Sequence, residues 1–182
     1  MNGKSFVDTK VTLGVPHYFA SYKISDGSLV NVTIMDTAGM EVFRALNTSY
    51  YKSANCCLLV YDITERTSFE DLKNYYIKKI KELCIENIPV ILLGNKTDLE
   101  NDRNVQPEEG ANFALEHNYI FMETSCLKNT NVADAFETLI ELTHREIMTK
   151  EQTMNNDPSN KNIVITNEKG EKEGKKKCCL FK

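Results

Sequence analysis

The fold is decided by one stretch, Pro89-Val90-Ile91-Leu92-Leu93-Gly94-Asn95-Lys96-Thr97-Asp98, in which an apolar run stops abruptly in polar side chains. Such a run predicts a strand that is buried on both faces of a sheet. In an open α/β sheet, ligands bind in the crevice beyond the carboxyl ends of the strands. We therefore predict that Asn95, Lys96 and Asp98 reach into a binding site.

An aspartate at this place can select a purine base. Its carboxylate can accept two hydrogen bonds from adjacent N–H and NH2 donors, which guanine presents on one edge and adenine does not. The aliphatic stem of Lys96 can lie along a ring face, and Asn95 can tie neighbouring loops together. Taken alone, these residues are also typical of a polar turn after a strand. A second apolar segment, Tyr119–Met122, ends in the polar residues Glu123–Cys126, and this repetition favours the binding site.

Strands with polar ends recur upstream in the chain. Val30–Met35 alternates as a strand before Asp36, and Cys56–Tyr61 is a fully apolar strand before Asp62. Between the strand before Asn95 and the strand Tyr119–Met122, the proline and acids of Gln106–Glu109 predict the start of a helix. Alternating strands and helices predict an α/β fold with a mostly parallel sheet.

Further elements are predicted from turn and helix signals. Tyr18–Ile24 and Leu29–Met35 should pair antiparallel across the turn Ser25–Gly27. Thr67–Glu70 has the spacing of a capping box, and Asn131 is a candidate N-cap. Apolar residues at three- and four-residue spacing then predict two amphipathic helices, with core positions at Phe69, Leu72, Tyr76, Ile80 and Leu83 in the first, and Val132, Phe136, Leu139, Ile140 and Ile147 in the second.

Together, the motifs resemble those of the Ras-like small GTPases, and most closely those of the Rab branch. Asp36–Glu41 is similar to the family's D-T-A-G-Q-E, Asn95–Asp98 to N-K-x-D, and Glu123–Cys126 to E-T-S-A. Thr12–Val15 resembles the T-I-G-V of switch I, and Ser49–Tyr51 resembles the S-Y-Y that follows switch II. The match runs from about residue 12 to about residue 148. The resemblance implies a P-loop GTPase-like, three-layer fold.

The resemblance also implies a function, namely a switch that binds GTP and GDP with Mg²⁺ and regulates vesicle traffic. Its expected partners are guanine nucleotide and the exchange factors, GTPase-activating proteins and effectors of the Rab type. The family's metal-binding positions correspond to Thr12 and Asp36. The nucleotide-binding positions correspond to Gly39, Asn95, Lys96, Asp98, Ser125 and Cys126.

The start of the chain departs from the family's pattern. A P-loop follows a strand and reads G-x-x-x-x-G-K-[ST], but only two residues precede Gly3-Lys4-Ser5. Thr12 then comes 7 residues after Ser5, too soon for a first helix. We predict that the first strand and most of the first helix are missing, which would leave buried backbone groups of neighbouring strands unpaired at about 1–3 kcal/mol each. Lys4 and Ser5 are weak candidates for phosphate and metal contacts.

Other departures affect catalysis and affinity. Met40 stands where the family has the glutamine that orients the attacking water, and a thioether cannot hold water as an amide does. No catalytic residue is therefore intact, and unassisted hydrolysis should be slow. Leu127 replaces a lysine that packs near the base, although Lys128 could partly substitute. A truncated gene product, a spliced variant, and a pseudo-GTPase that acts only as an interaction module are the alternatives.

Composition and length limit the remaining possibilities. The chain has 182 residues and 41% hydrophobic content, which predicts one domain over residues 1–150, truncated at its amino end. The net charge of -4 argues against nucleic-acid binding. Six cysteines without metal-ligand spacing predict reduced thiols and a cytosolic compartment. We expect a monomer.

The composition changes from about residue 151, where polar residues predict a disordered tail that reaches residue 182. The tail ends with Lys175–Lys177, Cys178 and Cys179, which resemble the prenylation signal of Rab proteins. Two lipid chains and a basic patch would supply the two signals that stable membrane anchoring needs. Cys179–Lys182 also fits the C-a-a-X pattern, although lysine is an unusual last residue. We predict lipidation of both cysteines and a location on the cytoplasmic face of intracellular membranes, in exchange with the cytosol.

Overall fold

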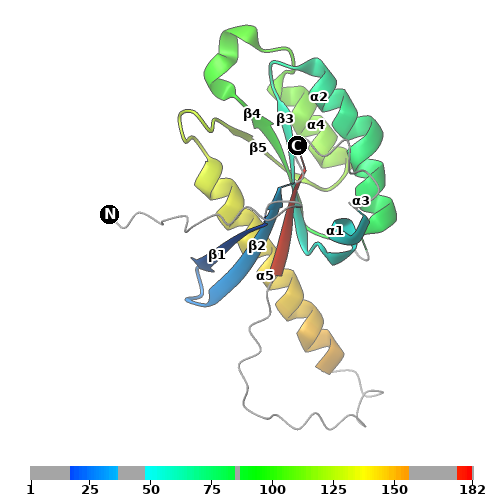
Figure 1. Ribbon diagram of the computed structural model, residues 1–182, viewed down its shortest axis with the longest axis vertical. Helices are drawn as coiled ribbons and strands as arrows, with labels where there is room; N and C mark the ends of the chain where they lie inside the picture. The colour runs from blue at the N-terminus through cyan, green and yellow to red at the C-terminus, as the bar shows by residue number, and fades with distance from the viewer. Residues whose placement is uncertain (1–16, 37–47, 85–86, 156–175, 182) are drawn as a thin grey trace.

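The computed structural model describes residues 17–36, 48–84, 87–155 and 176–181 (Figure 1). A six-stranded sheet lies at its centre, with the strand order β1-β2-β6-β3-β4-β5. Only β1 is antiparallel to its neighbour, and the other four neighbouring pairs are parallel. The strands are β1 (His17–Lys23), β2 (Leu29–Asp36), β3 (Cys56–Asp62), β4 (Val90–Asn95), β5 (Ile120–Thr124) and β6 (Lys176–Phe181).

Strands β1 and β2 form the predicted hairpin. His17 lies opposite Met35 and Lys23 lies opposite Leu29, so the register is set by the short connection. Gly27 has a φ of 89°, a conformation that glycine adopts at little cost and that closes the turn. The N–H of Ser28 donates to the side chain of Asp26 at 2.8 Å and stabilises the same turn.

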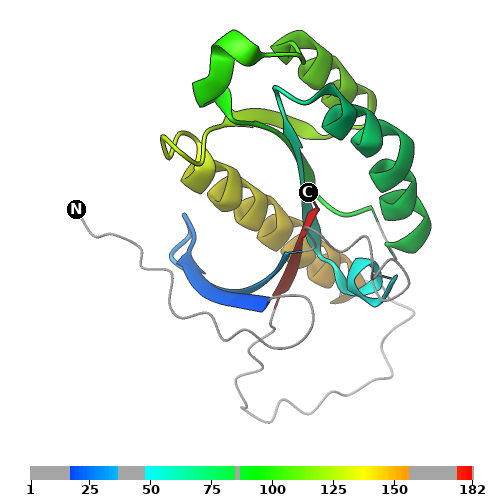
Figure 2. The same cartoon turned by 45° about the horizontal axis from the view of Figure 1, so that its top comes forward.

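Helices cover both faces of the sheet (Figure 2). One face carries α1 (Thr48–Ser53), a long helix and α4 (Pro107–Glu116), and the other carries α5 (Val132–Asn155). Pro107 is the first residue of α4, and the N–H of Gln106 donates to the Glu109 carboxylate at 3.1 Å, which confirms the predicted helix start. This arrangement of layers confirms the predicted small-GTPase-like fold class.

The long helix on the first face is made of α2 (Arg66–Asp71), a π-helical turn η2 (Leu72–Tyr76) and α3 (Ile77–Leu83). It begins at Arg66 without a side-chain cap, so the predicted capping box at Thr67–Glu70 is wrong. Ser68 Oγ lies instead 3.0 Å from the N–H of Asp62, from which it accepts a hydrogen bond. Because a π-helical turn holds an extra residue, the buried face shifts, and Ile77 enters the core while Tyr76 is half-buried.

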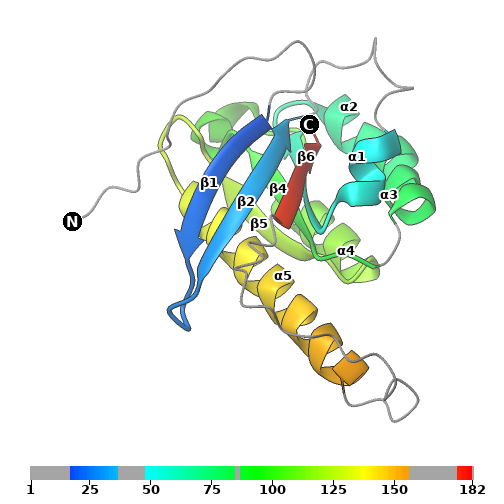
Figure 3. The same ribbon diagram turned by 60° about the horizontal axis from the view of Figure 1, so that its bottom comes forward.

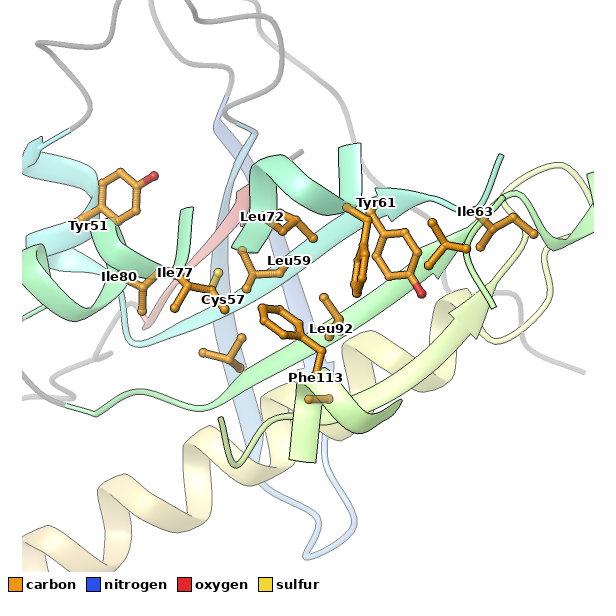
Figure 4. Packing of buried hydrophobic residues seen from close by; sticks show 14 of the residues in the cluster. Tyr51, Cys57, Leu59, Tyr61, Ile63, Leu72, Ile77, Ile80, Leu92 and Phe113 are labelled. Carbon is orange, nitrogen blue, oxygen red and sulfur yellow. The ribbon is translucent and has the colours of Figure 1, made fainter. Parts of the chain in front are cut away.

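Apolar side chains fill the space between the sheet and the helices (Figure 4). The rings of Tyr61 and Phe69 lie 4.8 Å apart, and those of Phe69 and Phe113 lie 5.5 Å apart. On the opposite face, Leu139 of α5 packs in a second cluster with Leu58 of β3. Complete burial of such a side chain contributes about 1.5–3 kcal/mol, so these clusters hold β3 and β4 from both faces.

The position between β2 and β3 is occupied by β6, which lies beside β2 in Figure 3. This is the place where the family resemblance puts the first strand. The predicted gap in the sheet is therefore filled, and the neighbouring strands have a pairing partner along β6. The structure also differs from the predicted disordered tail of residues 151–182, because α5 continues to Asn155 and Lys176–Phe181 form a strand.

Candidate functional site

The carboxyl ends of β4 and β5 bring the predicted base-binding residues together. Thr124 Oγ1, at the end of β5, donates to Asn95 Oδ1, at the end of β4, at 3.2 Å. Thr97 Oγ1 also donates to the carbonyl of Thr124 at 3.2 Å. Asn95 therefore ties the two strand ends together.

Asp98 and Ser125 meet across these strand ends. Ser125 Oγ donates to Asp98 Oδ1 at 2.5 Å and accepts from the N–H of Lys128 at 3.0 Å. Ser125 is 0% exposed, and its backbone exchanges two hydrogen bonds with Thr130. Within residues 17–36, 48–84, 87–155 and 176–181, no other hydrogen bond reaches the Asp98 carboxylate. Its second oxygen is thus available as an acceptor on a half-buried side chain.

Lys96 lies between Asp98 and the end of β3. Its Nζ is 2.5 Å from Asp62 Oδ2, and Thr64 donates to the other Asp62 oxygen from its N–H and its hydroxyl. Burial acts to raise the pKa of Asp62, but the hydrogen bonds from Lys96 and Thr64 outweigh burial and lower it. The hydrogen bond to Asp62 likewise raises the pKa of Lys96. The ammonium group is thereby held at the tip of β3.

The side chain of Lys96 is 49% exposed. Its backbone has a φ of 72°, in the left-handed region that residues other than glycine seldom adopt. This conformation turns the chain sharply from β4 into the 3₁₀ helix η3 (Thr97–Asp102). Asp98 therefore lies in a turn directly after the strand end.

An ion pair with a buried guanidinium stabilises the loop that carries Asp98. Arg103 has a side chain that is 6% exposed and binds Glu123 of β5 through two hydrogen bonds of 2.7 and 3.0 Å. It also donates to Glu100 and to the carbonyl of Val105. Hydrogen bonds to Glu100 and Glu123 raise the pKa of Arg103, so the guanidinium is always charged. The loop after β4 is in this way attached to β5.

The sequence did not identify every residue of this site. Asp62 was recognised as a polar strand end, but its ion pair with Lys96 requires that β3 and β4 be neighbours, as their register shows. Asn131 directly precedes α5, but its side-chain amide donates to the carbonyl of Glu123 at 2.8 Å instead of capping the helix. Arg103 carries no sequence signal of its own, because its two carboxylate partners come from different elements.

The other predicted site residues lie in several parts of the chain. Asp36 is the last residue of β2, and Cys126 is exposed directly after Ser125. Leu127, at the position of the family's lysine, is 82% exposed. Cys178 and Cys179 lie within β6. Outside the described residues lie Lys4, Ser5, Thr12, Gly39 and Met40.

The donor and acceptor groups can be compared with what a guanine nucleotide requires. At the base end, the free oxygen of Asp98 and the half-exposed side chain of Lys96 suit a flat ring with two adjacent donors. At the phosphate end, the described part of the chain contains no cluster of three or more metal-ligating side chains. Among the described residues, the groups that fit a nucleotide are those of the base-binding half.

A separate cavity of about 330 Å³ lies near the amino ends of β3 and β4. Asn55 and Pro89, which precede these strands, line it together with Thr143 and Ile147 of α5. It is thus at the opposite edge of the sheet from Asp98. In the described ranges, no helix combines the length and the apolar character needed to cross a lipid bilayer.

A sheet of this order, with N-K-x-D after β4 and a buried serine bound to its aspartate after β5, defines a small-GTPase-like protein. The Ras family model matches residues 2–145. The chain belongs to the Ras family, and its relatives place it with the Rab-like small GTPases.

Several curated relatives are similar over most of the chain. Ras-related protein RABA1b of Arabidopsis thaliana is 39% identical over 166 residues, which cover 91% of this chain and 74% of the relative. Ras-related protein Rab-8B of Pongo abelii is 36% identical over 174 residues, covering 93% and 81%. Ras-related protein RABA6a of Arabidopsis thaliana is 38% identical, and the chain spans only 60% of its length.

Proposed function

We propose that the chain belongs to a Rab-type switch that recognises the guanine base through Asp98 and acts in vesicle traffic on intracellular membranes. The observation that carries this proposal is the hydrogen bond from Ser125 to Asp98, which orients the carboxylate across the ends of β4 and β5. The two donors on guanine would be accepted by the two carboxylate oxygens of Asp98, namely the free oxygen and Oδ1, which also accepts from Ser125. Lys96, held by Asp62, would lie along the ring.

Each residue has a distinct part in this proposal. Asn95 and Thr124 hold the strand ends together, and the buried Arg103 fixes the loop that carries Asp98. Mg²⁺ and the phosphates would be bound by Asp36, Thr12 and Gly39, with weaker candidates at Lys4 and Ser5. When bound, Mg²⁺ neutralises charge on the transferring phosphoryl group. Because Met40 replaces a glutamine, hydrolysis by this chain would be slow without help from a GTPase-activating protein.

The experiment compares guanine with adenine nucleotides. A fluorescent GDP and the matching ADP are titrated into the 182-residue chain and into a version extended at its amino end with the first strand and P-loop of RABA1b. We expect the unextended chain to bind at least about a thousandfold more weakly, because backbone donors of the P-loop supply most phosphate contacts. Tight, stoichiometric nucleotide retained by the unextended chain during purification would contradict this expectation.

In the extended protein, Asp98→Asn should reduce the preference for guanine by about 10- to 100-fold, since a hydrogen bond to a charged group contributes about 1.5–3 kcal/mol. Asp102→Asn is the matched control, because Asp102 is exposed and lies in the same turn. An unchanged preference in Asp98→Asn would show that another residue selects the base.

A second candidate function is an interaction module that has the shape of a Rab protein but binds no nucleotide. The observation in its favour is β6, which holds the place that the resemblance gives to the strand leading into the P-loop. In that case neither GDP nor ADP would bind the unextended chain at millimolar concentration. Retention of effector binding without nucleotide would support this candidate.

A further inference from the structure

The strand β6 fills a position that could hold one strand only. It pairs with β2 from Val32↔Lys176 to Asp36↔Leu180, and with β3 from Cys56↔Cys178 to Leu59↔Phe181. Both pairings are parallel, and β2 and β3 contact each other through no ladder of their own. The sheet is continuous only while a parallel strand lies between them.

The facing edges of β2 and β3 carry backbone groups that need a hydrogen-bonding partner. Ile34 and Met35 of β2 and Cys57 and Leu59 of β3 are all buried while β6 lies between the two strands. Without β6, the N–H and C=O groups on the two facing edges would lose their partners, which is unfavourable in a buried place. The edges of β2 and β3 thus form a binding site for one extended, parallel segment.

We infer that this site binds the chain's own segment Lys176–Phe181, and that pairing in the sheet and lipidation of Cys178 and Cys179 exclude each other. The lipidation of the two cysteines rests on the proposed function. The binding of Lys176–Phe181 between β2 and β3 rests on the strand pairing alone. Cys178 lies opposite Ile34 and Cys56, and Cys179 lies opposite Met35 and Cys57. The cysteines of the lipid signal are therefore the middle residues of a central strand.

A prenyl transferase needs this segment as a free, extended peptide. In the reaction, the thiol sulfur forms a thioether bond to the first carbon of a prenyl diphosphate, pyrophosphate leaves, and the thiol proton passes to solvent. A segment paired on both edges cannot enter another protein's active site at the same time, so β6 must first leave the sheet. Departure of β6 opens the edges of β2 and β3, and the lipid-modified state thus requires either another strand or loss of order in the sheet centre.

The pairing is tested by hydrogen exchange with mass spectrometry on the unmodified 182-residue chain. We expect the amides of Cys178–Phe181 to exchange at least about 100-fold more slowly than in a synthetic peptide of residues 176–182, as paired strand amides do. Exchange within about threefold of the peptide would overturn the inference.

A proline variant then tests whether β2 and β3 depend on β6. Leu180→Pro removes an N–H from β6 and should accelerate exchange in Val32–Asp36 and Cys56–Leu59, because proline does not fit a central strand. The matched control is Glu173→Pro, which lies before the strand in the sequence. Equal exchange in β2 and β3 for both variants would overturn the dependence.

The competition between strand pairing and lipidation is tested by adding a strand at the amino end of the chain. This test needs no substitution that could prevent folding. The chain carrying the RABA1b first strand and P-loop has two segments for one place, so exchange at Cys178–Phe181 should accelerate. Its modification by the purified Rab-type prenylation enzymes with geranylgeranyl diphosphate should be at least about tenfold faster than that of the unextended chain. The control carries a proline in the middle of the added strand and should behave like the unextended chain.

The outcomes separate the two proposals. Equal modification rates in the extended and unextended chains would overturn the competition. If neither chain is modified, both the lipidation in the proposed function and the competition between lipidation and strand pairing are overturned. Slow amide exchange at Cys178–Phe181 would still support the pairing of β6 in the sheet. Failure of guanine binding would leave both readouts unaffected, because neither uses nucleotide.

Discussion

Tyr61 buries a hydroxyl group that makes no hydrogen bond with any described residue. The side chain is 1% exposed, and the ring packs against Phe69. Burial also raises the pKa of Tyr61, so the hydroxyl is protonated at neutral pH. The hydroxyl lies close to Gly110, where a Cβ would come within 2.6 Å of it. Glycine at this position therefore leaves space for the tyrosine hydroxyl, which makes no hydrogen bond with the described residues.

Tyr61→Phe should leave the fold intact and increase the free energy of unfolding by about 1–3 kcal/mol, because an unpaired buried polar group is removed. Thermal and urea unfolding measure the change. Tyr119→Phe is the control, since Tyr119 is only half-buried and should give no gain. A lower stability for Tyr61→Phe would show that its hydroxyl has a partner such as a buried water.

Cysteine reactivity should differ between two positions. Burial raises the pKa of Cys84 to about 11, whereas Cys126 is exposed after the end of β5. Only the thiolate reacts with iodoacetamide, and at pH 8 a thiol of pKa 11 is ionised to about one part in a thousand. We expect Cys126 to be alkylated first, with Cys84 becoming reactive as the pH approaches 11. Peptide mass spectrometry follows both sites, and equal rates at pH 8 would contradict the burial of Cys84.

Among the secondary-structure elements, η3 and β5 depend on one ion pair. Arg103→Ala would leave Glu123 without its two hydrogen bonds, and we expect a loss of about 3 kcal/mol in urea unfolding, the cost of breaking a well-buried pair. Arg145→Ala, on the exposed part of α5, should change the stability by less than about 0.5 kcal/mol.

A double variant checks that the cost comes from the unpaired carboxylate. Arg103→Ala combined with Glu123→Gln should cost less than the sum of the two single changes, because the charge that one change exposes is removed by the other. Strict additivity would mean that Arg103 stabilises the loop through Glu100 and the Val105 carbonyl instead.

The elements differ in how well the sequence predicts them. β3 and β4 are apolar runs of the length of a strand, and their burial on both faces is dictated locally, so both were predicted. The hairpin of β1 and β2 follows from a turn that requires glycine. The capping box failed because the helix begins at Arg66, one residue before Thr67, and the Thr67 hydroxyl donates to the side chain of Glu65 instead.

β6 could not be predicted from its own residues. Lys176–Phe181 follow a long polar stretch, and six residues bury too little to order a free segment. The strand forms because β2 and β3 offer two facing edges, and these come from residues more than a hundred positions earlier in the chain. The same reason explains the base site, where Asp98 and Ser125 were predicted and the pairing of Lys96 with Asp62 was not.

For the whole molecule, the proposed lipid anchor predicts a change of location. Changing Cys178 and Cys179 together to serine should move the protein from the membrane fraction to the cytosolic fraction of cells that express the extended form. Replacing Lys175–Lys177 by glutamine should have a smaller effect, because each lysine contributes about 1 kcal/mol near an anionic surface, whereas each buried CH₂ of a prenyl chain contributes about 0.8 kcal/mol. Cys84→Ser is the control. A double-serine variant that stays on membranes would place the anchor elsewhere.

The central position of β6 also sets the order in which the protein can fold. All other described strands precede β6 in the chain, so on the ribosome they are made while the place between β2 and β3 is still empty. Contacts between segments this distant in sequence close slowly, and open strand edges invite association with other chains in the meantime. The nascent protein should therefore depend on chaperones until β6 has emerged, and among the described strands the middle of the sheet is the last part to form.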